Sequence, residues 1–289
     1  MGKYRFPSLL TFCVPWLLSG LVLMSALGCQ FAKPFRTITP SQYLSGEHSR
    51  EANAAKEGGQ LDEAERRFEY AIRYSKKDPE LRRQYAEVLW EQGKTEQALK
   101  ELAVAEHYGG TKNVLLQLSY AEKLIASNNP MSAFRRADNA VRLDPQQSRA
   151  WALRGHARWQ IAVERLSRNE MSGTDKWFEQ AQTDYYTALG LFPDDKEKRV
   201  MLKELAQLQM FYGGPEHALA TWQHLEEMYS QGNEPTELFT GKAEAYLALK
   251  RVDDAIDYLT KAQQRLPEDR VIRQQMQRAI AMKTGQVIR

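Results

Sequence analysis

One pattern of small residues recurs along the chain and limits its fold more than any other feature. Six alanines begin six copies of the pattern, at steps of 34, 35, 48, 37 and 37 residues. An apolar residue follows each alanine after four residues and again after seven. Positions spaced in this way share one face of an α-helix, so each copy predicts a helix that packs closely against a neighbour. The six alanines are Ala64, Ala98, Ala133, Ala181, Ala218 and Ala255.

The copy around Ala133 shows how one helix ends and the next begins. Leu143 and Asp144 precede Pro145, which disfavours helical geometry in the residue before it and so predicts the end of the helix. A second helix is expected shortly afterwards, with Trp151 and Gly155 on its first turns. Each repeat is therefore a pair of antiparallel helices. One pair cannot bury its apolar face alone, so neighbouring pairs must stack.

The arrangement resembles the tetratricopeptide repeat, whose frame places W-x2-L-G-x2-Y before A-x3-F and a final proline over about 34 residues. Pro145, Pro193 and Pro267 occupy the proline position. The resemblance implies an all-α fold, a right-handed α-solenoid of about six helix pairs over residues 45–268, with a capping helix and tail at 269–289. The first-helix signature is degraded, since Arg154 and Arg158 stand in the usual leucine and tyrosine positions.

Residues 1–28 are predicted to be a signal peptide. Lys3 and Arg5 come before an uncharged apolar run at 7–27, which small residues end just before Cys29. Gly28 and Cys29 resemble the end of a bacterial lipobox, and this implies lipidation of Cys29. An uncleaved membrane helix and a cleaved peptide without lipid remain alternatives. All three would export the repeats across a membrane.

Residues 29–44 are expected to form a lipidated, extended tether, because two prolines interrupt any helical periodicity. In bacterial lipoprotein sorting, an aspartate directly after the cysteine favours the inner membrane, and Gln30 stands there instead. The resemblance therefore favours the outer membrane of the cell envelope, with the solenoid facing the periplasm.

Composition and motifs argue against several function classes. The net charge of +3 falls to about +1 once Lys3 and Arg5 are removed, too little to suggest a nucleic-acid surface. No phosphate-binding loop, nucleophile motif or metal-ligand spacing is present, and His217 and His224 lie seven residues apart without a further ligand. We expect no enzymatic activity, no cofactor, no metal and no small-molecule substrate.

Tetratricopeptide repeats usually bind a protein or peptide with the first helices, which line the concave side. The resemblance assigns inward positions to Arg83, Glu87, Trp90, Leu118, Glu122, Arg149, His156, Trp159, Lys203 and Gln207. Large aromatics are usually buried, so Trp90 and Trp159 are expected to belong to the core between repeats. The alternative is that both indoles anchor a ligand in the groove, because aromatic and arginine side chains dominate binding hot spots.

The fourth repeat is longer than the others, and its extra residues include a polar segment at 166–176. The segment is expected to be a tolerated surface loop, with a partner-binding element as the alternative. The sequence as a whole predicts a membrane-tethered interaction scaffold of the bacterial envelope. The alternative is a regulatory or accessory subunit of an envelope enzyme or of a pilus or secretion assembly complex.

Overall fold

The computed structural model describes residues 39–230 and 232–285, and the regular secondary structure of that range is entirely helical. The predicted signal peptide, Cys29 and most of the predicted tether lie outside the described residues. The first helices of the six pairs are α2 (Pro40–Glu57), α4 (Pro79–Glu91), α6 (Val114–Ala126), α8 (Ser148–Ser167), α10 (Asp195–Phe211) and α12 (Thr236–Ala248). The second helices are α3 (Leu61–Tyr74), α5 (Thr95–His107), α7 (Pro130–Leu143), α9 (Thr174–Gly190), α11 (Pro215–Glu227) and α13 (Val252–Arg265). The last helix is α14 (Arg270–Thr284), and a short 3-10 helix, η1 (Gly110–Lys112), joins α5 to α6.

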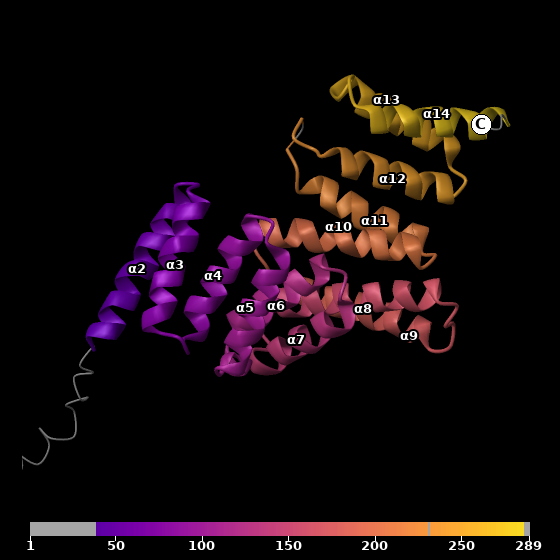
Figure 1. Cartoon of the computed structure of the whole chain (residues 1–289). Helices are drawn as coiled ribbons and strands as arrows, with labels where there is room; N and C mark the ends of the chain where they lie inside the picture. The colour runs from indigo at the N-terminus through magenta and orange to yellow at the C-terminus, as the bar shows by residue number, and fades with distance from the viewer. Residues whose placement is uncertain (1–38, 231, 286–289) are drawn as a thin grey trace, which may run out of the picture.

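The six helix pairs stack in chain order from α2 at one end of the molecule to α14 at the other (Figure 1). This arrangement confirms the predicted α-solenoid. Each of the six marker alanines lies on a second helix and is fully buried. The residues four and seven positions later are buried as well, because they lie on the same helix face.

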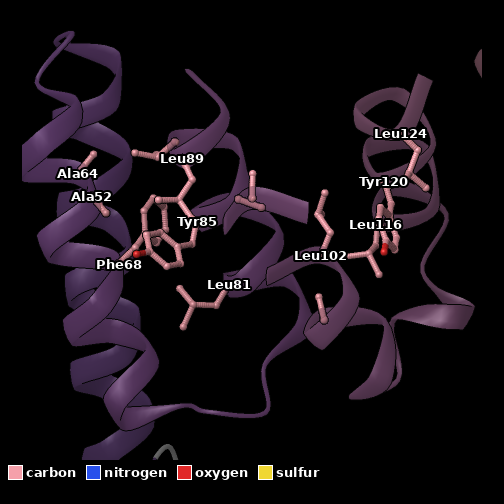
Figure 2. Close-up of a cluster of buried hydrophobic side chains, with 14 of the residues drawn as sticks. Ala52, Ala64, Phe68, Leu81, Tyr85, Leu89, Leu102, Leu116, Tyr120 and Leu124 are labelled. Carbon is pink, nitrogen blue, oxygen red and sulfur yellow. The ribbon is translucent and has the colours of Figure 1, made fainter. Parts of the chain in front are cut away.

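Figure 2 shows how the first pairs share a core. Phe68 on α3 and Tyr85 on α4 pack against one another with ring centroids 6.1 Å apart. Leu102 on α5 and Leu116 on α6 continue the same cluster into the next pairs. The apolar core is therefore continuous across pair boundaries, as stacking requires.

An ion cluster explains why the fourth repeat departs from the usual signature. Asp184 on α9 is almost fully buried and accepts hydrogen bonds from Arg154 at 2.8 and 3.1 Å and from Arg158 at 2.6 Å. Arg154 also donates to Asp138 on α7 at 2.9 Å. Burial lowers the pKa of Arg158, against the opposing effect of the Asp184 carboxylate. The two arginines thus replace apolar packing with a paired set of charges between α7, α8 and α9.

The structure corrects the predicted end of the tether. Helix α2 begins at Pro40, so residues 40–44 belong to its first turns and not to an extended segment. Pro40 stands at the start of the helix, where its missing N–H and fixed φ are tolerated. The Thr39 hydroxyl accepts from the Gln42 amide, and the Gln42 side chain accepts from the Thr39 amide, which completes a capping box.

The extra residues of the fourth repeat mostly lengthen helices. Helix α8 extends past Leu166 to Ser167, and α9 begins at Thr174. The loop predicted at 166–176 is therefore reduced to residues 168–173. Gly173 precedes α9 with a φ of +73°, a left-handed conformation that glycine adopts without strain. No side chain caps α9 at this position.

Helix α14 is the expected capping helix. The Asp269 carboxylate caps its N-terminus by accepting from the amides of Val271 and Ile272. Ile272 and Ala279 close the apolar core of the last pair. Over the described range, the helices are too short or too polar for any of them to cross a membrane.

Candidate functional site

Polar contacts join each first helix to the next, from α4 to α10, and they involve many of the predicted groove residues. Glu87 on α4 accepts from Ser119 on α6 at 2.5 Å, and Glu122 on α6 pairs with Arg149 on α8 at 2.7 Å. His156 on α8 lies 3.0 Å from Glu204 on α10. The predicted groove residues therefore lie on adjacent first helices, although several of them form hydrogen bonds or ion pairs with one another.

The α4 end of this surface is the most tightly paired. Arg83 binds Glu80 at 2.6 Å and lies 3.9 Å from Glu87, while the Lys123 ammonium reaches Glu87 at 2.9 Å. Burial opposes ionisation of Glu87, but hydrogen bonds from Ser119 and Lys123 outweigh it and lower the pKa of Glu87 below its usual value. These charges stabilise the boundary between α4 and α6 more than they offer partners to a ligand.

The Glu122–Arg149 pair is more accessible. The side chains of Glu122 and Arg149 are 42% and 44% exposed. Exposed ion pairs contribute roughly 0–1 kcal/mol, so a ligand could separate this pair at little cost.

The two predicted aromatic anchors are partly buried. The Lys123 ammonium lies 5.4 Å from the ring centroid of Trp90, and the ring of Trp159 is 5.7 Å from that of His156. Both indoles pack against core clusters. The indole N–H of Trp159 is buried and has no hydrogen-bond partner among the described residues. A role for either ring in binding remains a prediction.

The prediction that Leu118 belongs to the binding groove is wrong. Leu118 is only 3% exposed and packs against Ala140, Val141 and Ala150 in the core between α6, α7 and α8. It was assigned inward from the repeat frame, but the neighbouring helices cover it, so it cannot contact a ligand on this surface.

Lys203 and Gln207 border a different part of the surface, between α10 and α12. Lys203 lines a hollow of about 190 Å³ and Gln207 one of about 340 Å³. Trp222 on α11 lines both hollows. The repeat frame did not assign Trp222, Lys196 or Arg199 to this surface. A detectable signal was the spacing of Lys196, Arg199 and Lys203, which places three basic residues on one helix face.

The described residues bring together no metal site: none of their histidine, cysteine, aspartate and glutamate side chains form a group of three that could hold an ion. Three carboxylates of the first helices, Glu87, Glu122 and Glu204, pair with lysine, arginine and histidine. Part of the charge on this surface is therefore neutralised within the chain.

Comparison with known proteins agrees with this geometry. The tetratricopeptide repeat family model matches residues 55–110. Among curated proteins, the sequence has no match. Solved structures with the same fold include PilW, described as a widely conserved type IV pilus biogenesis factor, with 16% identity and a TM-score of 0.66 over 80% of this chain and 97% of PilW.

Two further structures share the fold. PilF from Pseudomonas aeruginosa is 14% identical, with a TM-score of 0.62 over 84% of this chain and 100% of PilF. MamA from Desulfovibrio magneticus RS-1 is 16% identical, with a TM-score of 0.53 over 66% of this chain and 97% of the MamA chain. At these identities the likeness concerns the fold. Together with the family match, it supports the fold of tetratricopeptide repeat proteins.

Proposed function

We propose that this chain is a membrane-tethered scaffold of the bacterial cell envelope that binds a peptide or protein through its first helices. The observation that carries the proposal is the side-by-side placement of α4, α6, α8 and α10, with accessible charged side chains such as Glu122 and Arg149. It has no catalytic activity of its own, and needs neither cofactor nor metal. Fold similarity to PilW and PilF supports an accessory role in a pilus or secretion assembly as the specific form of this function.

The proposed anchor is a lipid on Cys29, which holds the solenoid at the periplasmic face of the outer membrane. The Gly28–Cys29 pair at the end of an uncharged apolar run supports this assignment. Because α2 begins at Pro40, only residues 30–39 would separate the lipid from the first helix. Ten extended residues reach about 35 Å at most, so the first pair would stay near the membrane.

The anchor is tested by Cys29→Ser. We expect the variant to leave the membrane fraction or to remain unprocessed, while mass spectrometry of the wild-type mature protein shows an acylated N-terminal Cys29. Cys13→Ser is the matched control, because Cys13 lies inside the apolar run and its loss should change neither processing nor lipidation. A membrane-bound wild-type form that still begins at Met1 would contradict the lipid anchor.

The scaffold is tested by affinity capture of the tagged full chain from detergent extracts of its own host. We expect defined, stoichiometric envelope proteins in the eluate. An eluate without such partners, or catalytic turnover by the purified chain, would contradict the scaffold.

A further inference from the structure

The pairing of adjacent first helices changes beyond α10. Polar contacts join α4 to α6, α6 to α8 and α8 to α10. Within the described residues, no side-chain hydrogen bond or ion pair joins α10 to α12, and a cleft lies between these two helices instead. The surface between α10 and α12 therefore differs from the closed, internally paired boundaries that precede it.

The α10–α12 cleft contains two hollows, and a third adjoins it, mainly between α12 and α14. A hollow of about 190 Å³ shares Trp222 and Glu237 with the next, of about 340 Å³. The second shares Met210 and Glu244 with a third, of about 380 Å³. Shared lining residues make these hollows continuous, and a row of open hollows suits an extended chain better than a small rigid molecule.

One end of the cleft is basic. Lys196, Arg199 and Lys203 follow one another along α10 and line the first hollow. The ion pairs found in the described part of the chain involve none of these three residues. The Arg199 guanidinium lies 5.3 Å from the ring centroid of Tyr229, which helps to hold it in place. Unpaired basic groups in a hollow attract a carboxylate, and an arginine can bind one through two parallel hydrogen bonds.

An indole ring lies where the two hollows meet. Trp222 is 1% exposed and its indole N–H has no hydrogen-bond partner among the described residues. Gly241 on α12 lies against the ring so closely that a Cβ atom there would come within 2.3 Å of it. The indole is thus fixed between the helices. A buried donor without a partner costs stability, but the ring itself gives the cleft a rigid aromatic wall.

At the second hollow the α10 wall ends in two apolar side chains, while the α12 wall carries two glutamates. Met210 and Phe211 line the second hollow, and the Phe211 side chain is 53% exposed. Arg199 and Met210 are separated by about 16 Å along the helix axis, which an extended peptide spans in about five residues. Glu237 and Glu244 on the α12 wall would repel a ligand that is acidic along its whole length.

We infer that the α10–α12 cleft binds an extended peptide segment of a partner protein, with an acidic residue at the Arg199–Lys203 end and a bulky apolar residue about five positions away at the Met210–Phe211 end. This inference rests on the proposed scaffold function. It specifies where on the surface the partner binds and which kind of peptide is bound.

The test is a displayed library of random short peptides, selected on the full chain in detergent. The selection should enrich peptides that carry an acidic residue and, about five positions away, a bulky apolar residue. The binding of an enriched, fluorescently labelled peptide is then measured by anisotropy. Arg199→Glu with Lys203→Glu should weaken it by about tenfold or more, because both charges that face the acidic residue are reversed.

The matched control is Lys100→Glu with Lys261→Glu, which reverses two exposed charges on α5 and α13, away from the cleft, and should leave binding unchanged. A peptide whose acidic residue is replaced by lysine should bind the Arg199→Glu, Lys203→Glu variant more tightly than it binds the wild type. No enrichment, enrichment without the acidic residue, or equal binding by the two double variants would overturn the inference.

Other occupants give distinct results. A dimer that Arg199→Glu abolishes would assign the cleft to a second copy of this chain. Peptide binding that appears only after deletion of residues 286–289 would assign it to the chain's own tail, and tighter binding of a short oligothymidine would assign it to nucleic acid. Each of these results would overturn the inference. Capture of envelope partners by the Arg199→Glu, Lys203→Glu variant at the wild-type level would overturn it and leave the scaffold function standing.

Discussion

The cluster around Asp184 shows what a single buried charge requires. Its carboxylate accepts three hydrogen bonds from Arg154 and Arg158 and is almost completely shielded from water. Gly155 lies beside it, and a Cβ atom there would meet the Asp184 side chain at 3.2 Å and the Ala181 carbonyl oxygen at 3.0 Å. The glycine of the repeat signature is thus retained for close packing, even where the neighbouring leucine and tyrosine positions have become arginine.

Asp184→Asn should lower the free energy of unfolding by about 3–5 kcal/mol, because it leaves the Arg158 guanidinium without its counter-ion and Arg154 with Asp138 alone. Chemical denaturation followed by circular dichroism measures the change. The variant Arg154→Leu, Arg158→Tyr, Asp184→Ala removes all three charges and returns the arginine positions to the repeat signature. It should lose less stability than Asp184→Asn alone. A larger loss in the triple variant would show that the ion cluster stabilises the fold better than apolar packing does.

At the scale of helices, the sequence predicted the second helices best. Their small and apolar residues contact fixed neighbours inside each pair, so the spacing from Ala64 to Ala71 was sufficient evidence of burial. The start of α2 was misjudged because Pro40 was interpreted as a tether signal, although Thr39 and Gln42 already formed the pattern of a capping box.

The first helices were harder to predict because their exposure depends on the neighbouring pair. Leu118 and Glu122 are one turn apart on α6, yet Leu118 is buried by α7 and α8 while Glu122 reaches Arg149 at the surface. The cleft beside Lys203 depends on how α12 packs over Trp222, which spacing along one helix does not reveal. The sequence therefore predicted which helices form the groove. It did not predict which of their residues are covered by neighbouring helices and which remain accessible.

Close packing between helices is tested at Ala140 on α7. Ala140 is fully buried against Leu118 and Ala150, so Ala140→Leu should force α6, α7 and α8 apart and cost about 1–3 kcal/mol. Thermal denaturation should show a clear decrease in melting temperature. The control is Arg168→Leu, in the short loop before α9, where the side chain is 62% exposed and only pairs with Glu164. Equal destabilisation by the two substitutions would contradict the assigned helix packing.

At the scale of the whole molecule, the core is a series of clusters that share helices. One cluster joins α8, α9 and α10, the next joins α10, α11 and α12, and the last joins α12, α13 and α14. The first cluster lies mainly between α2 and α7 (Figure 2). Each helix pair therefore contacts mainly its neighbours. In such a solenoid, stability is approximately a sum of repeat and interface contributions, so damage at one end should not spread to the other.

Hydrogen–deuterium exchange with mass spectrometry tests this expectation with one core substitution near each end. Leu259 on α13 and Phe68 on α3 are both fully buried, in the last and the first cluster. Truncation to alanine should cost about 2–5 kcal/mol at either site. Leu259→Ala should speed exchange in α12, α13 and α14 and leave α2, α3 and α4 protected, whereas Phe68→Ala should do the reverse. Faster exchange along the whole chain in both variants would instead show that the six pairs unfold as one cooperative unit.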